Sequence, residues 1–97
     1  MSAYIIVEIK VNDPVEYEEY KKMVPPTIAQ YDGRFLVRGG AVETLEGGWA
    51  PSRIVVLEFP SVARAQEWYN SVEYRPARDL RQRTSTGKMI LVEGVAA

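Results

Sequence analysis

The sequence predicts one α+β domain whose elements follow the order strand, helix, strand, strand, helix, strand. Three observations predict this class. Apolar and polar side chains alternate in four short segments, which is typical of strands. Two segments with helical spacing begin at capping residues. The 97 residues suffice for one hydrophobic core but not for two, so we expect a single domain over residues 1–97.

Four segments are predicted strands. Residues 4–11 alternate between an apolar and a mixed face, residues 34–38 form a second strand, and residues 53–59 form a third. The last strand, residues 88–95, begins after Gly87. A long connection that is rich in glycine joins the second and third strands, and we predict a partly paired hairpin there.

The first predicted helix begins at Asp13, because aspartate can cap a helix and the following proline suits its first position. The prolines at residues 25–26 interrupt the helical spacing and predict a kink or a restart. Residues 32–33 end the segment, and we expect Gly33 in the left-handed conformation.

The second helix begins after Ser61, which can cap it, and a further helical piece runs to Thr84 beyond a turn at residues 74–76. The complete order is the split βαβ, or ferredoxin-like, arrangement. Its sheet ordinarily has four antiparallel strands with both helices on one face.

The two faces of the predicted sheet differ in composition. One face is wholly apolar and is expected to meet the helices; its residues are Ile5, Val7, Ile9, Phe35, Val37, Val55, Leu57, Phe59, Ile90 and Val92. The other face mixes large apolar groups with charges; its residues are Tyr4, Ile6, Glu8, Arg34, Leu36, Arg38, Ile54, Val56, Glu58, Met89, Leu91 and Glu93. This second face is too apolar to be left in water. We therefore predict a homodimer in which two such faces pack around a partly polar cavity.

Composition excludes several kinds of chemistry. The chain has no cysteine and no histidine, so disulfides, thiolate zinc sites, thiol nucleophiles, histidine bases and histidine haem ligands are absent. We expect no metal and no cofactor. Twelve basic and thirteen acidic residues leave a net charge of −1, which favours neither nucleic acid nor a membrane surface as a partner. The first residues do not show the pattern of a secretory signal, and we expect a cytoplasmic protein.

Several motifs resemble those of a known family. They are Arg38-Gly39-Gly40, the segment from Leu45 to Trp49, the segment from Arg53 to Ser61, Trp68-Tyr69-x-Ser71-x-x-Tyr74, and Arg81. Over Tyr4 to Gly94 the chain resembles domain-of-unknown-function family 1330, within the dimeric α+β barrel superfamily. The resemblance implies the ferredoxin-like fold and a dimer, and it implies no settled activity. Superfamily relatives include antibiotic-biosynthesis-type monooxygenases, muconolactone-isomerase-like enzymes and haem-dependent enzymes, and the haem branches use a histidine that this chain lacks.

Arg38 is a candidate ligand-binding residue on the mixed face. Its guanidinium could clamp a carboxylate or an enolate, and Gly39 would let a ligand approach the backbone closely. The alternative is a structural ion pair with Glu58 or with an acid of the second copy. We favour the ion pair, because buried charges are usually paired.

Glu8 and Glu58 are the candidate catalytic residues. We expect the first and third strands to run parallel, which would place both carboxylates towards one end of the mixed face and Glu93 at the other. Two carboxylates at one end could raise each other's pKa and serve as a general acid or base. The alternative, charge balance against neighbouring basic residues, is favoured.

Aromatic and basic residues of the second helical stretch are further candidates. Trp68 is predicted to lie in the core, whereas Tyr69 or Tyr74 could reach the mouth of a cavity and donate a hydroxyl. Packing is the favoured alternative for these rings. Trp49 and Arg81 belong to the motifs that carry the resemblance, and we include them as candidate ligand-binding residues. The arginines of residues 75–83 are otherwise expected to form a solvated helix face with local ion pairs.

Three functions are compatible with these candidate residues. The first is a non-catalytic module that binds a small anionic or aromatic metabolite, with Arg38 holding the anion. The second is a cofactor-independent enzyme that transfers a proton or assists oxygenation, in which Glu58 or Glu8 moves the proton and Tyr74 orients the ligand. The third is a purely structural dimer.

Overall fold

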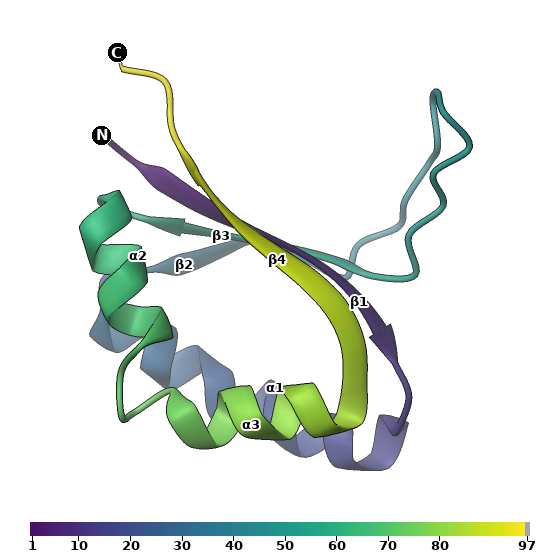
Figure 1. Cartoon of the computed structure of the whole chain (residues 1–97), viewed down its shortest axis with the longest axis horizontal. Helices are drawn as coiled ribbons and strands as arrows, with labels where there is room; N and C mark the ends of the chain where they lie inside the picture. The colour runs from purple at the N-terminus through teal and green to yellow at the C-terminus, as the bar shows by residue number, and fades with distance from the viewer. Residues whose placement is uncertain (97) are drawn as a thin grey trace.

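A computed structural model of the chain describes residues 1–96. Its elements are β1 (Ala3–Val11), α1 (Pro14–Gln30), β2 (Arg34–Arg38), β3 (Ile54–Phe59), α2 (Val62–Tyr69), α3 (Arg75–Thr84) and β4 (Ser85–Glu93). The strands form one sheet in the order β2-β3-β1-β4, and every neighbouring pair is antiparallel. The helices lie together on one side of this sheet (Figure 1). The predicted α+β fold with a four-stranded antiparallel sheet is confirmed.

Two helices begin at the capping residues that the sequence predicts. The side chain of Asp13 accepts the backbone N–H of Glu16 at 3.1 Å and opens α1. The hydroxyl of Ser61 accepts the backbone N–H of Arg64 at 3.1 Å and opens α2. Each such cap stabilises its helix by about 1 kcal/mol, so local sequence decides where both helices start.

The interior and the end of α1 differ from the prediction. The helix is continuous to Gln30 although it contains Pro25 and Pro26, so the predicted restart is wrong. The left-handed residue after the helix is Asp32, with φ of 63°, rather than Gly33. Gly33 is needed for space instead, because a Cβ at this position would lie 2.5 Å from the ring of Phe59.

The last strand presents its side chains to the faces opposite to those predicted. We call the side of the sheet that meets the helices the core face, and the other side the open face. Leu91 pairs with the buried Ile5, so Leu91 and Met89 lie on the core face and pack against the core. Ile90 and Val92, which were predicted to be buried, lie on the open face and are exposed.

A β-bulge changes the faces of β2. Phe35 keeps the predicted core face, but the register shifts between Phe35 and Val37, so Leu36 is an extra residue in the strand. Val37 then pairs opposite Val56 and lies on the open face. Arg38, which was predicted for the mixed face, is brought to the core face instead.

The core is built around an aromatic stack. Trp68, Tyr74 and Phe59 are almost completely buried, and the rings of Trp68 and Tyr74 stack with centroids 4.0 Å apart. The indole N–H of Trp68 donates to the hydroxyl of Thr27 at 3.1 Å, which satisfies the one polar group of that side chain. The prediction that Trp68 lies in the core is confirmed, whereas Tyr74 is buried in the stack and does not lie at a cavity mouth.

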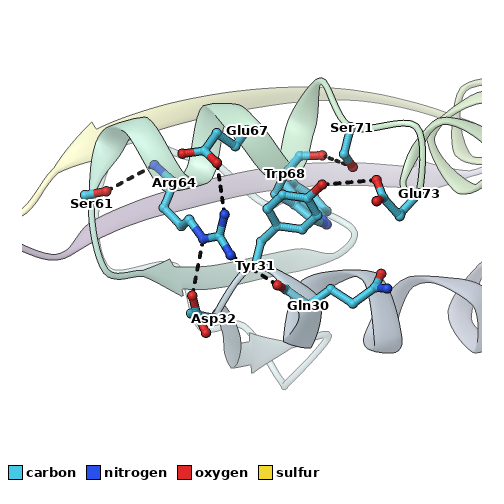
Figure 2. Close-up of polar contacts among 9 residues, drawn as sticks. All are labelled: Gln30, Tyr31, Asp32, Ser61, Arg64, Glu67, Trp68, Ser71 and Glu73. Atoms are coloured by element: carbon cyan, nitrogen blue, oxygen red, sulfur yellow. Dashed lines mark hydrogen bonds and ion pairs between the residues drawn. The ribbon is translucent and has the colours of Figure 1, made fainter.

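A polar cluster joins the end of α1 to α2, as Figure 2 shows. Arg64 donates to Asp32 at 3.2 Å, to Glu67 at 2.9 Å and to the carbonyl of Gln30 at 3.3 Å. Its guanidinium also lies 4.7 Å from the centre of the Tyr31 ring. Each nitrogen of this guanidinium therefore has an acceptor, and the cluster acts as a structural clasp between the two helices.

The open face of the sheet carries a broad apolar surface with a few charges. Its apolar members are Tyr4, Ile6, Val37, Ile54, Val56, Ile90 and Val92, and its charged members are Glu8, Lys10, Arg34, Glu58 and Lys88. The helices lie on the other side of the sheet (Figure 1). None of the helices within residues 1–96 has both the length and the apolar character needed to cross a bilayer.

Candidate functional site

An inner pocket lies between the core face of the sheet and α1. Apolar side chains of β1, β3 and α1 line most of it, together with Trp68 and Met89. Its charged lining residues are Lys21, Arg38 and Arg53, and no aspartate or glutamate is among the residues that line it. The water-accessible volume is about 20 Å³, enough for one ordered water. The pocket is therefore small, and its charged lining residues are all basic; one of them, Lys21, is paired with Glu18 at 3.0 Å.

Arg38 is positioned by a proline of α1. A helical carbonyl ordinarily accepts from the N–H four residues later, but Pro25 has no N–H to offer Lys21. The guanidinium of Arg38 donates to this Lys21 carbonyl at 2.6 Å and lies 4.4 Å from the centre of the Phe35 ring. The predicted ion pair between Arg38 and Glu58 does not form. One donor of Arg38 is occupied by α1, and the others remain available at the pocket.

Arg53 and Tyr17 each carry a buried polar atom without a hydrogen-bond partner. These atoms are the Nε of Arg53 and the hydroxyl oxygen of Tyr17, and both side chains line the inner pocket. The guanidinium of Arg53 lies 5.8 Å from the centre of the Tyr17 ring. An unsatisfied buried donor costs about 1–3 kcal/mol. Both side chains therefore keep donors free inside the pocket at a cost in stability.

Gly39 makes room for the guanidinium of Arg53. Its φ is 72°, in the left-handed region, and a Cβ at this position would collide with the guanidinium of Arg53. Arg53 was not among the predicted site residues. The signal that could have identified it is its alternation with Val55 and Leu57, which places a charged residue at the start of the most apolar face. Nothing in the sequence distinguishes Tyr17 from an ordinary core tyrosine.

A buried cluster of phenols and one guanidinium lies beside the pocket. Arg81 is 7% exposed and donates to the hydroxyl of Tyr74 at 3.4 Å; within residues 1–96 it forms no ion pair. It therefore does not lie on the solvated helix face predicted for residues 75–83. Burial, with Tyr74 nearby, raises the pKa of Tyr20 far above its ordinary value. Tyr20 also lines the inner pocket, so it links the pocket to this cluster.

An outer groove lies between α2 and β4. It is lined mainly by apolar side chains, by Gln66 and Asn70, and by Tyr69, which was predicted to reach a cavity mouth. The water-accessible volume is about 200 Å³, ten times that of the inner pocket. Met89 lines both the outer groove and the inner pocket. A flexible methionine is thus in contact with both spaces.

The two predicted catalytic carboxylates are far apart. β1 and β3 are antiparallel, and Glu58 pairs opposite Tyr4 while Glu8 lies four residues further along β1, a separation of about 13 Å along the strand. The expected parallel arrangement was wrong. Glu93, predicted for the other end of the mixed face, pairs opposite Ala3 next to the Glu58 end.

Each carboxylate also accepts a hydrogen bond from a neighbouring side chain. Glu58 accepts from Arg34 at 2.7 Å and from Tyr4 at 3.3 Å. The hydrogen bond from Arg34 is the main cause that lowers the pKa of Glu58, against a smaller effect of burial. Glu8 accepts the indole N–H of Trp49 at 3.1 Å. Both pairs lie on the open face, so neither carboxylate meets Arg38 within one chain.

The predicted site residues thus fall into separate places. Arg38 lines the inner pocket, Tyr69 lines the outer groove, and Arg81 with Tyr74 lies in the buried cluster; Glu8, Trp49 and Glu58 belong to the open face or to the connection beside it. Within residues 1–96 no group of three or more acidic side chains could hold a metal ion. The roles predicted for these residues stay predictions.

Solved structures with the same fold include proteins of unknown function and a cofactor-independent oxygenase. A protein of unknown function from Rhodopseudomonas palustris has a TM-score of 0.77 at 17% identity, covering 99% of this chain and 84% of that one. SnoaB, a cofactor-independent oxygenase from Streptomyces nogalater, has a TM-score of 0.67 at 13% identity, with coverage of 99% and 95%. A dimeric ferredoxin-like protein of unknown function from Jannaschia sp. CCS1 has a TM-score of 0.73 at 10% identity, with coverage of 97% and 100%. At these identities the likeness shows the fold alone.

The sequence also matches a family. No curated protein matches it, but the domain of unknown function DUF1330 matches over residues 2–95. This range includes every element of the fold, and it agrees with the resemblance carried by the motifs around Arg38, Trp68 and Tyr74. The chain therefore belongs to the DUF1330 family, a family defined by a domain of unknown function.

Proposed function

We propose that this protein is a homodimer that binds a small anionic aromatic molecule between the core face of its sheet and its helices. The observation that carries the proposal is the inner pocket. Three cationic side chains and an unpartnered phenol line it. Lys21 is paired with Glu18 at 3.0 Å, whereas Arg38 and Arg53 form no ion pair within residues 1–96. A buried donor ordinarily has a hydrogen-bond partner, and a bound anion would supply one to the Nε of Arg53 and to the hydroxyl of Tyr17.

The chemistry of the lining defines the ligand class. Arg53 and Tyr17 offer free N–H and O–H donors, which match a carboxylate or an ionised enol. The surrounding aliphatic and aromatic side chains match a planar apolar body. The ligand is therefore an organic acid with a ring, rather than a free inorganic anion.

The sizes of the inner pocket and the outer groove imply that side chains move when the ligand binds. Space for one water in the inner pocket cannot hold a ring, whereas the outer groove offers about 200 Å³. Displacement of Met89, which lines both, would join the two spaces. In the proposed complex the acid group meets Arg53 and Tyr17, and the ring extends past Met89 towards Tyr69.

The homodimer part of the proposal rests on the open face. Contiguous apolar surface of this kind marks an interface in soluble proteins, and structural neighbours of this fold include dimers. At micromolar concentration, light scattering should give about twice the 11.0 kDa chain mass. Val56→Asp should abolish the dimer, because it places an unpaired charge in an apolar interface. A wild-type monomer at all concentrations would contradict this part.

Ligand binding is tested with a matched pair of probes. 2-Naphthoate and the uncharged 2-naphthamide have the same ring, and only the first offers an anion to Arg53. We expect 2-naphthoate to raise the melting temperature and to bind with a calorimetric signal, because a ligand of the folded state stabilises it. The amide should bind at least tenfold more weakly. Equal binding of the two probes would reject the anion site. If neither probe binds, the ligand-binding proposal is rejected and the purely structural dimer is the function that remains.

A cofactor-independent enzyme is the second candidate function. The likeness of the fold to the oxygenase SnoaB and the buried Tyr20–Tyr74–Arg81 cluster beside the pocket favour it. Glu8 and Glu58 lie on the open face, so the cluster, rather than these carboxylates, is the nearer source of a proton. Oxygen uptake with 1,4-dihydroxy-2-naphthoate, an oxidisable anionic ring, should exceed its spontaneous oxidation if the protein is such an enzyme. Uptake equal to that in buffer would support binding alone.

A further inference from the structure

The connection between β2 and β3 forms an arm that extends away from the rest of the molecule (Figure 1). We define the arm as residues 40–52. It includes three apolar side chains that are open to solvent: Leu45 is 86% exposed, Trp49 is 59% exposed and Val42 is 46% exposed. The arm turns at Gly47 and Gly48, both with positive φ. A segment this long that presents apolar groups to water is typical of a binding element.

The arm lies beside the open face of the sheet. The indole N–H of Trp49 donates to the carboxylate of Glu8 at 3.1 Å, and Glu8 lies on the open face with Ile54 opposite it. In Figure 1 the arm extends on the side of the sheet away from the helices. Any molecule that covers the open face would therefore also meet the arm.

The chemistry of the arm matches this same open face. The arm carries two acidic residues, Glu43 and Glu46, and no basic residue. The open face combines apolar side chains with five charged residues. Arg34 is paired with Glu58 and Glu8 accepts from Trp49 of the arm, whereas Lys10 and Lys88 form no ion pair within residues 1–96. Apolar groups with acids on one element and apolar groups with lysines on the other are complementary.

We propose that the arm of each chain clasps a second copy of this chain, with Leu45 and Val42 packed on the second copy and the acids of the arm facing its basic residues. The proposal rests on the homodimer of the proposed function but not on its ligand. It also has a consequence for the site, because Arg38 and Arg53 flank the arm on its two sides. Contact with the second copy holds the ends of the arm in place, and the second copy thereby orders both arginines of the inner pocket.

The test measures the dimer dissociation constant by analytical ultracentrifugation over a series of dilutions. Leu45→Asp should raise the constant at least tenfold, because it places a charge in the proposed contact. Val15→Asp is the matched control, since Val15 is 80% exposed but lies on α1, on the other side of the sheet. It should leave the constant within twofold of the wild type. An unchanged dissociation constant for the Leu45→Asp dimer overturns the proposed contact between the arm and the second copy, while the homodimer stands. A wild-type monomer overturns both the contact and the homodimer.

A cross-linking experiment identifies what the arm touches. Because the chain has no cysteine, Leu45→Cys carries a single thiol to which a benzophenone maleimide can be attached. Photolysis of a mixture of ¹⁴N- and ¹⁵N-labelled protein should give cross-linked peptides that pair the two isotopes and map to β1 or β4. Cross-links found only within peptides of one isotope would show that the arm contacts its own chain, and would overturn the proposal.

Discussion

Two arginine environments on the helix side of the sheet show how the same side chain can serve structure or offer a site. Arg64 has carboxylates at 2.9 Å and 3.2 Å and a backbone carbonyl at 3.3 Å. Arg53 and Arg38 line a pocket that no carboxylate enters, and Arg53 keeps a buried N–H without an acceptor. The first environment is complete within one chain, whereas the second lacks an acceptor.

The difference shows which arginine to examine for function. A satisfied guanidinium stabilises the fold and gains nothing from a further ligand. A guanidinium with a free buried donor pays a desolvation cost that an added acceptor would offset. Arg64 is the hub of the clasp between α1 and α2 (Figure 2), and Arg53 is the residue that we expect to bind an anion.

The largest expected effect is on binding, and it separates the two arginines directly. Arg53→Met should weaken 2-naphthoate binding by about 10- to 100-fold, because a hydrogen bond to a charged group contributes about 1.5–3 kcal/mol. Arg64→Met should leave the affinity within twofold of the wild type. Isothermal titration calorimetry on both variants measures this. An equal loss in the two variants would indicate a general effect of charge rather than a site.

A smaller effect is expected on stability, with opposite signs for two tyrosines. Tyr17→Phe removes a buried hydroxyl that has no partner, so it should raise the free energy of unfolding by about 1 kcal/mol. Tyr74→Phe removes the acceptor of Arg81 and should lower it by about the same amount. Urea denaturation at one fixed protein concentration compares them, because dimer stability depends on concentration. Loss of stability in Tyr17→Phe would show that its hydroxyl has an acceptor after all.

The smallest expected effect concerns a third arginine, Arg34, which is paired with the carboxylate of Glu58. Its hydrogen bond lowers the pKa of Glu58 below the ordinary 4.5, so the pair stabilises the folded state above that pH. This contribution is lost as the pH falls through the lowered value. As the pH is lowered from about 5, the melting temperature of the wild type should therefore fall more steeply than that of the Glu58→Gln variant. Parallel pH profiles for the two proteins would contradict the assignment.

Much of the fold can be predicted from local sequence. Asp13 and Ser61 mark the helix starts because a side-chain cap depends only on neighbouring backbone N–H groups. Alternation over residues 4–11 identifies β1 and its core face. The bounds of β2 and the burial of Trp68 also follow from the pattern. The apolar surface of the second sheet face is predicted as well, although several of its members change.

The wrong assignments share one physical cause, which is long-range register. Residues 89–92 are all apolar, so alternation carries no information there, and pairing with β1 selects Met89 and Leu91 for the core face. In β2 the bulge at Leu36 reverses the faces of Val37 and Arg38. The strand direction that separates Glu8 from Glu58 is likewise a property of the assembled sheet.

The candidate site depends on the tertiary structure more than the fold does. Local sequence patterns are enough to predict the element order, the helix starts and an apolar second face, and composition alone excludes cysteine and histidine chemistry. Only the folded chain brings Arg53 against Tyr17 and Arg38 to the Lys21 carbonyl that Pro25 leaves free, because these groups come from the residue before β3, from α1 and from β2 and meet through packing. A donor without an acceptor is a property of three-dimensional surroundings, and no local pattern encodes it.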